Sequence, residues 1–367
     1  MKITDVTTIL LNDPEGPTIQ DATIFSPGLQ NIVSVYVIVK TDEGLEGLGT
    51  SEGGRPVKAV VDDSLRRVLV GEDPMNTERI WNRMFWTVRS GGRKGIAINA
   101  MSAVDIALWD LKAKALGLPL YKLLGAYSEA TPVYGSGGWT NFTTEELVAE
   151  QMSYVERGFT RIKLKVGKDF GQAEEEDLRR LAAVRQAAGP DVEIYVDANN
   201  GYYARQAIRM SRAFEDYNVK WFEEPVLADD IEGLAAVSRA TTIPVATGEH
   251  EWTKFGFKEL MARGAADIVQ PDIGRVGGVT EWIKVANMAQ AFNLPVASHG
   301  YQEVHLHVAC AIPNMMVVEY LGLLERRCRL FYKDFPEPRA GMWAPYPDRP
   351  GLGLELSPWA LEHLRVG

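Results

Sequence analysis

Three acidic residues recur at equal spacing in the middle of the chain, and each one ends a short apolar run. Asp197, Glu223 and Glu249 follow one another at intervals of 26 residues. Three converging carboxylates repel one another unless a cation lies among them. An all-oxygen ligand set favours a hard ion, so we expect Mg²⁺ first and Mn²⁺ second. No His-rich cluster accompanies these residues, which makes zinc a weaker candidate.

Two lysines precede the acidic residues in a strand-like segment. Within Arg161–Val166, Lys163 and Lys165 alternate with apolar residues. With a period of two, the apolar side chains pack on one side and both lysines point to the other. Two inward lysines are costly unless anionic groups surround them. We expect a nearby cation and the second lysine to lower the pKa of either ammonium, so that one of them could serve as a base.

A second candidate for proton transfer combines Asp272 with His299, which end two later apolar runs. A carboxylate beside an imidazole fixes its tautomer and raises its pKa, which makes a usable general acid or base. A cation between two proton-transfer groups suits removal of a proton α to a carboxylate. Each residue alone has an ordinary interpretation, because acids after strands often cap helices and strand-end lysines are often solvated. All of these ordinary interpretations would have to hold at once, so we prefer the joint interpretation as a catalytic site.

The elements that would position these residues form a repeating pattern from residue 131 onward. Helical segments such as Thr280–Phe292, with apolar residues at i, i+3, i+4 and i+7, separate short β-rich runs. Eight such runs predict a TIM-type barrel, whose catalytic residues lie at the C-terminal ends of its strands. The runs are Thr131–Gly135, Arg161–Val166, Glu193–Asp197, Val219–Glu223, Pro244–Gly248, Asp267–Gln270, Pro295–Ser298 and Val317–Tyr320.

The N-terminal part is predicted to be α+β. Strands are expected at Lys2–Leu11, Ile32–Lys40 and Leu45–Thr50, a helix at Ala97–Leu116, and loops at 13–30 and 51–56. The fold class is therefore α/β, a modified (β/α)7-8 barrel with a capping domain. We expect the capping domain at residues 1–125, the barrel at 126–334, and a C-terminal segment, 335–367, that returns to the capping domain.

Composition limits the function classes. The 367 residues include 39 basic and 49 acidic side chains, for a net charge of −10, which argues against nucleic acid as a partner. Two cysteines, Cys310 and Cys328, form no disulfide framework and fit a reducing compartment. Asp5 stands where a signal peptide would need an apolar core, so we expect none, and the uncharged stretch Val304–Val318 is too short to span a bilayer. We expect a cytoplasmic protein with no membrane partner.

At this point the sequence resembles the enolase superfamily, specifically its mandelate racemase subgroup, over nearly the whole chain. The resemblance rests on Lys163-Leu164-Lys165, Val196-Asp197-Ala198-Asn199, Glu223-Glu224-Pro225, Gly248-Glu249, Pro271-Asp272, Ser298-His299 and Glu319. It implies that Asp197, Glu223 and Glu249 are Mg²⁺ ligands. It also implies that the loops at 13–30 and 50–56 close the site over a small carboxylate substrate, and that the chain forms a homo-oligomer, from dimer to octamer.

The resemblance also implies roles for the remaining residues. Lys165 resembles the base on one face of the substrate, and His299, paired with Asp272, the base or acid on the other. Lys163 and Glu319 look like partners of the substrate carboxylate, and Asn199 sits where the family often contacts substrate. His250 directly follows a candidate metal ligand and could also reach the substrate, whereas Glu224 is expected to be structural. Arg275-Val276-Gly277-Gly278 fits no phosphate-binding pattern.

Most members of this subgroup are acid-sugar dehydratases. The resemblance therefore implies abstraction of the C2 proton of an aldonate or aldarate, a metal-stabilised enediolate, and loss of the 3-hydroxyl to give a 2-keto-3-deoxy acid. An intact pair of bases also permits 1,1-proton transfer, so a racemase or epimerase of a 2-hydroxy acid is the alternative. The capping loops lack an aromatic pattern that would favour mandelate, although Phe25 is present. A non-enzymatic relative would show a lost ligand or base, and none is lost.

Overall fold

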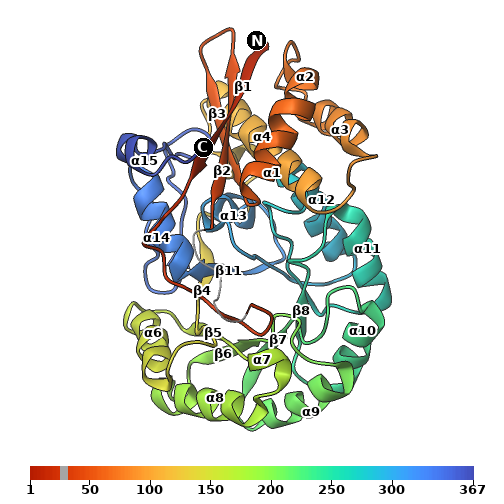
Figure 1. The fold of residues 1–367 in the computed structure, drawn as a ribbon, viewed down its shortest axis with the longest axis vertical. Coiled ribbons are helices and arrows are strands. Elements are labelled where there is room, and N and C mark those ends of the chain that lie inside the picture. Colours follow the sequence, from red (N-terminus) through yellow and green to blue (C-terminus); the bar gives the residue numbers. More distant parts are fainter. Residues whose placement is uncertain (25–31) are drawn as a thin grey trace.

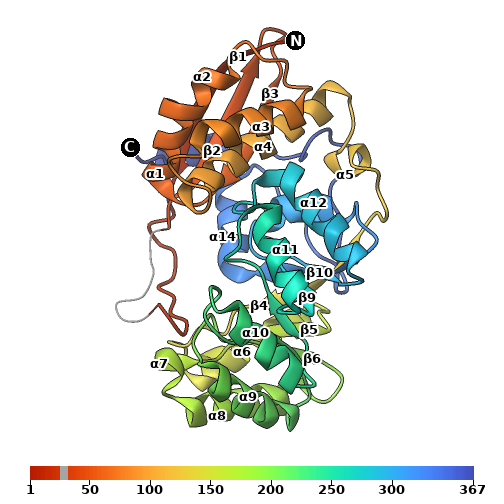
Figure 2. The same cartoon turned by 90° about the vertical axis from the view of Figure 1, so that its right-hand side faces the viewer.

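The computed structural model describes residues 1–24 and 32–367, so Phe25 lies outside the described residues. A closed parallel barrel forms the lower part of the molecule, and an antiparallel sheet with helices lies above it (Figure 1, Figure 2). Within the described chain the barrel contains eight strands in sequential order, and pairing of the last with the first closes it. The predicted α/β barrel with an N-terminal α+β cap is confirmed.

The barrel strands and the helices between them agree with the predicted runs to within a few residues. The strands are β4 (Thr131–Ser136), β5 (Arg161–Lys165), β6 (Glu193–Asp197), β7 (Val219–Glu223), β8 (Val245–Thr247), β9 (Ile268–Val269), β10 (Val296–Ala297) and β11 (Met315–Leu321). The helices are α6 (Thr144–Glu156), α7 (Lys168–Gly171), α8 (Glu174–Ala188), α9 (Ala204–Glu215), α10 (Ile231–Ala240), α11 (Thr253–Arg263), α12 (Gly278–Ala291), α13 (Gln302–Ala309) and α14 (Gly322–Phe331).

The cap combines a three-stranded antiparallel sheet with helices. Its elements are β1 (Ile3–Leu11), β2 (Ser34–Thr41), β3 (Glu46–Ser51), α1 (Gly54–Ala59), the π-helical η1 (Val60–Leu65), α2 (Arg66–Leu69), α3 (Thr77–Val88), α4 (Ile96–Ala115) and α5 (Leu120–Leu123). The predicted C-terminal boundary of the loop at 51–56 is wrong, because α1 already begins at Gly54. Pro56 is compatible with that helix, since first-turn N–H groups have no partner within the helix.

Helix α4 joins the cap to the barrel. It is buried along most of its length, and a stripe of polar residues on it faces barrel segments. Ser102 Oγ accepts a hydrogen bond from Gly277 N at 2.9 Å, and Asp105 accepts two from Thr280, at 2.8 and 2.7 Å. Buried polar groups stabilise a contact only when they are paired, so these bonds fix the position of the helix on the barrel.

The C-terminal segment contains β12 (Met342–Trp343) and α15 (Pro358–His363) and ends against the cap. Val366 N donates to Leu10 O at 3.0 Å.

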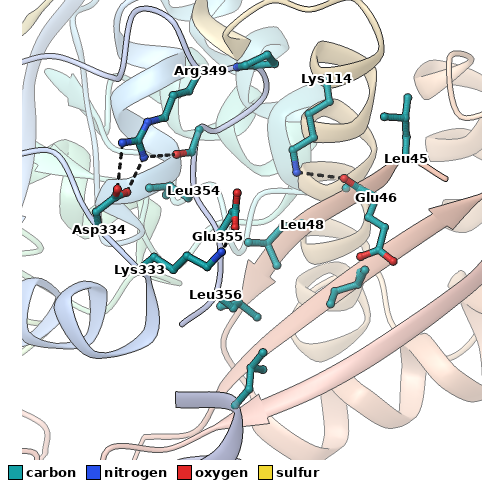
Figure 3. Close-up of a pocket in the computed structure, with 15 residues that line it drawn as sticks. Leu45, Glu46, Leu48, Lys114, Lys333, Asp334, Arg349, Leu354, Glu355 and Leu356 are labelled. Carbon is teal, nitrogen blue, oxygen red and sulfur yellow. Dashed lines mark hydrogen bonds and ion pairs between the residues drawn. The ribbon is translucent and has the colours of Figure 1, made fainter. Parts of the chain in front are cut away.

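A groove of about 810 Å³ lies between this segment and the cap. Figure 3 shows the residues that line it. Its cations are paired: Arg349 with Asp334 at 2.6 Å, Lys333 with Glu355, and Lys114 with Asp110 at 2.6 Å. The groove therefore presents no unbalanced charge to a ligand. The domain limits at 125 and 335 stay predictions.

Strand β3 lies so close to α4 that two of its residues must be glycine. A Cβ at Gly49 would lie 2.0 Å from the backbone oxygen of Ala103, and one at Gly47 would lie 2.0 Å from that of Ala107. We expect Gly49→Ala to lower the free energy of unfolding by about 1–3 kcal/mol, the usual cost of overpacking. Thermal unfolding measures it. Gly91→Ala is the control, because its Cβ would meet nothing closer than 3.7 Å. Equal melting temperatures would contradict this account of the β3–α4 contact.

Candidate active site

Strand parity directs the chemically active side chains into the barrel. In β5, Ile162 and Leu164 belong to the hydrophobic core outside the barrel, whereas Lys163 and Lys165 are buried on the inner side. A layer of aromatic residues fills the barrel below them. Tyr195 and Trp221 stack with their ring centroids 4.5 Å apart. This packed layer supports the site from below and excludes water from that side.

The three predicted metal ligands come together at the top of the barrel. Asp197, Glu223 and Glu249 are buried, and one oxygen of each lies within 4.8 Å of the others. Asn199 N donates to Asp197 Oδ1 at 2.9 Å and Trp221 Nε1 to Glu223 Oε2 at 2.9 Å, which orients both carboxylates. Glu249 Oε2 is buried and accepts no hydrogen bond from the described residues. A buried all-oxygen set with an unused acceptor fits a hard divalent cation such as Mg²⁺.

The two lysines lie against these carboxylates. Lys163 Nζ is 2.6 Å from Glu223 Oε1 and 3.1 Å from Glu319 Oε1, and Lys165 Nζ contacts Asp197. Burial lowers the pKa of each lysine, but the surrounding carboxylates together raise it by more. Glu223 and Glu319 contribute most to this rise at Lys163, and Asp197 contributes most at Lys165. The side chains around the lysines thus raise both pKa values, because the carboxylates outnumber the ammonium groups there. The lowering expected from a nearby cation stays a prediction.

His299 and Asp272 form the second proton-transfer pair. His299 Nδ1 lies 2.8 Å from Asp272 Oδ2, and Asp272 Oδ1 accepts hydrogen bonds from Gly274 N at 2.7 Å and Arg275 N at 3.1 Å. The opposite nitrogen, His299 Nε2, is 3.3 Å from Glu249 Oε2 and so faces the carboxylate cluster. Burial lowers the pKa of His299, but Glu249 and Asp272 raise it by more, to about 10. The imidazole is thus held ready to carry a proton.

The remaining predicted residues border the same space. Glu319 Oε2 accepts from Gly300 N at 2.8 Å, and its other oxygen faces Lys163. Asn199 has a positive φ of 39° and a buried Oδ1 without a hydrogen-bond partner in the described chain. His250 Nδ1 pairs with the buried Glu224 Oε1 at 2.7 Å. Glu224 therefore orients His250, in keeping with its predicted structural role.

One cavity of about 360 Å³ connects these residues with the cap. Lys165, Asn199, Glu249, His250 and His299 line it from the barrel. Residues of both predicted capping loops line it from the other side, namely Ile19, Asp21, Thr23, Ile24, Thr50 and Glu52. Its volume lies in the range of small-ligand pockets. The site is therefore shared between the cap and the barrel.

Arg275 and Glu52 form an ion pair beside the site that was not predicted from the sequence. Arg275 Nε lies 2.6 Å from Glu52 Oε1 in the cap, and Arg275 Nη1 donates to Glu249 O at 2.9 Å. Ser51 Oγ also donates to Gly274 O at 2.8 Å. The loop that holds Asp272 is thereby tied to the cap. No local motif signals this pair, because its members are 223 residues apart.

A closed barrel with buried carboxylates, lysines and an Asp–His pair at the C-terminal ends of its strands defines a class of metal-binding barrel enzymes. Residues 146–360 match the family described as enolase C-terminal domain-like, and residues 17–125 match the mandelate racemase/muconate lactonizing enzyme N-terminal domain. The chain belongs to this family of the enolase superfamily.

Individual relatives carry different reaction names. The L-talarate/galactarate dehydratase of Salmonella typhimurium is 37% identical over 352 residues, which cover 94% of this chain and 86% of that protein. Its crystal structure liganded with Mg and L-lyxarohydroxamate has a TM-score of 0.92 at 34% identity, over 100% of this chain and 93% of that one. A racemase from Streptomyces coelicolor with bound magnesium has a TM-score of 0.93 at 32% identity, over 99% of this chain and 100% of that one. Among the described residues, no helix is long and apolar enough to cross a membrane.

The Glu52–Arg275 pair yields a stability test. Arg275→Met removes the cationic partner of Glu52 and leaves carboxylates unpaired in a partly buried contact, in which the Glu52 side chain is 35% exposed. We expect the free energy of unfolding to fall by about 2 kcal/mol, less than for a fully buried pair, because solvent screens Glu52. The control is Arg263→Met, which breaks exposed pairs with Glu232 and Glu259 and should cost less than about 1 kcal/mol. Thermal unfolding of both variants measures the difference, and equal losses would refute the coupling of cap and barrel through Arg275.

Proposed function

We propose that this protein is a Mg²⁺-dependent dehydratase of acid sugars that converts an aldonate or aldarate into a 2-keto-3-deoxy acid. The observation that carries the proposal is where the two proton-transfer groups lie. Each one is next to a different carboxylate of the same cluster. Lys165 contacts Asp197, and His299 Nε2 lies 3.3 Å from Glu249 Oε2. The identity to a named talarate/galactarate dehydratase over most of both chains supports the same reaction class.

In the proposed reaction, Lys165 or His299 takes the proton from C2, and the electron pair of the C–H bond moves into the carboxylate as an enolate. The bond from C3 to its hydroxyl then breaks, and His299, held by Asp272, donates a proton so that water leaves. The resulting enol gains a proton at C3 to give the 2-keto-3-deoxy acid. When Lys165 is the base, His299 must enter the cycle protonated, and Lys165 must enter it as the neutral amine.

Asp197, Glu223 and Glu249 would hold the cation, which when bound supplies a fixed positive charge for the substrate carboxylate. Mn²⁺ would satisfy the same oxygen ligands. Lys163 would provide a second positive charge for that carboxylate, and Glu319 a hydrogen-bond partner for its opposite oxygen. Asn199 and His250 would bind hydroxyl groups of the sugar chain, because both line the cavity beside the carboxylate cluster.

A racemase or epimerase of a 2-hydroxy acid is the second candidate. Two bases on opposite sides of one carbon can remove a proton and return it from the other side. The similarity to a structure named as a racemase with bound magnesium favours this reading. A cytoplasmic location and a homo-oligomeric state stay predictions.

The deciding experiment is ¹H NMR of the protein with Mg²⁺ in D₂O against pooled aldonic and aldaric acids. New signals of a 3-deoxy methylene group would support dehydration. Loss of the C2 proton signal without such a product, or growth of an epimer, would replace the dehydratase with the racemase. No change with any pool would overturn both assignments.

His299→Asn tests the proposed acid. We expect dehydration to fall roughly 10²- to 10⁴-fold, the usual contribution of general acid–base catalysis, because no other group would protonate the leaving hydroxyl. Exchange of the C2 proton with D₂O by Lys165 should survive for substrates of suitable configuration. The control is His363→Asn, which alters an exposed histidine of α15. Dehydration by His299→Asn at the wild-type rate would disprove the role of His299.

Removal of the metal tests the proposed cofactor. Exhaustive EDTA treatment should lower activity by roughly 100-fold or more, because the substrate carboxylate loses its main stabilising charge. Added Mg²⁺ should restore it, and EDTA saturated beforehand with Mg²⁺ is the control. Full activity after metal removal would exclude the proposed mechanism.

A further inference from the structure

The cavity that holds the carboxylate cluster extends to a second region, formed by the cap and α14. From the cap it is lined by Ile32, Val33, Ser34 and Tyr36, and from α14 by Leu324, Arg327 and Cys328. These side chains belong to neither the proposed metal ligands nor the two proton-transfer pairs. They are positioned to contact the part of a bound substrate that does not react.

Arg327 is distinct among the arginines of α14. Arg326 pairs with Asp13 at 2.6 Å, and Arg329 pairs with Glu325 at 2.7 Å. Arg327 forms no ion pair with any described residue. Within the described part of the chain its one hydrogen bond runs from Nη2 to the backbone oxygen of Ile32 at 3.1 Å, and its buried Nε has no partner there.

A largely buried guanidinium without a carboxylate is costly, because the protein replaces little of the hydration that the charge loses. For the same reason, burial lowers the pKa of Arg327 below the ordinary arginine value. A planar guanidinium binds carboxylates through paired N–H donors. An anionic ligand entering the cavity would therefore supply the partner that the folded chain lacks.

We propose that Arg327 binds the distal carboxylate of the substrate, so that the enzyme prefers dicarboxylic acid sugars, the aldarates, over aldonates. This inference rests on the proposed dehydratase function and specifies its substrate class. One carboxylate of the substrate lies at the reacting end, beside Lys163 and the proposed metal ligands. The other lies at Arg327, and the sugar chain spans the cavity between them.

One acidic residue in the same cavity bears on this assignment. Glu303 also lines it, and its carboxyl accepts a hydrogen bond from Tyr332 OH at 3.4 Å and contacts Cys328 Sγ at 3.8 Å. It forms no ion pair with Arg327 in the described structure. Burial raises the pKa of Glu303 to about 7, and its two carboxyl oxygens accept from Tyr332 and Cys328, not from Arg327. Glu303 therefore leaves Arg327 available to a ligand anion.

The test compares kcat/KM for galactarate with that for galactonate, which has the same configuration but one carboxylate. We expect wild type to prefer the diacid by about 10- to 100-fold, the range of a charge-assisted contact. Arg327→Met and Arg327→Gln should reduce that ratio at least tenfold, and Arg327→Lys should retain part of it. Arg329→Met is the control, and its ratio should equal that of wild type. Melting temperatures establish that each variant is folded.

The outcomes separate this inference from the proposed function. Dehydration that favours galactonate, or equal losses on both substrates in Arg327→Met, would overturn the role of Arg327 and leave the dehydratase assignment in place. If neither acid is turned over, the proposed function fails for this substrate pair, and calorimetry with Mg²⁺ then decides the inference. Tighter binding of galactarate to wild type than to Arg327→Met would support it, and equal binding would overturn it.

Discussion

The balance of charge at the top of the barrel is the constraint on which the rest of the structure depends. Four buried carboxylates, Asp197, Glu223, Glu249 and Glu319, face two buried ammonium groups, Lys163 and Lys165. In a poorly solvated interior this arrangement persists only if each group is held by donors of fixed geometry. The aromatic layer in the barrel, the indole N–H of Trp221 and the backbone N–H of Gly300 supply part of that support. The proposed cation would supply the missing positive charge.

The second constraint is that the cap must keep its position over the barrel. Neither part encloses the cavity alone, since the cap contributes one side and the barrel the other. The polar stripe of α4 achieves this, because Ser102 and Asp105 bond to the segment that follows β9. Glu52 and Arg275 add a contact directly beside Asp272. The same loop thus orients His299 and holds the cap, so that closure of the cavity and orientation of the imidazole depend on shared contacts.

Chemistry and recognition are separated in this fold. The groups proposed to move protons and hold the metal stand on barrel strands or directly after them, where backbone hydrogen bonds fix their positions. The groups proposed to read the distal substrate stand on the cap, on α14 and on the loops between elements. Relatives with different reaction names share the overall fold with this chain at TM-scores above 0.9. Such a division allows one scaffold to keep its proton chemistry while sequence changes in the cap alter which substrate binds.

The sequence by itself determined the barrel, the cap and the residues that meet at the strand ends. Alternation of side chains along a strand places Lys163 and Lys165 on one face, and parallel neighbours bring Asp197, Glu223 and Glu249 to one edge. The first rule is local and has a period of two, and the second follows from the parallel order of consecutive strands. The sequence did not reveal the Glu52–Arg275 pair. Nor did it reveal Arg327, which has no ion-pair partner among the described residues and contacts Ile32 across 295 residues. Only tertiary structure decided them, because a local pattern fixes which face a residue occupies but not which distant element packs against that face.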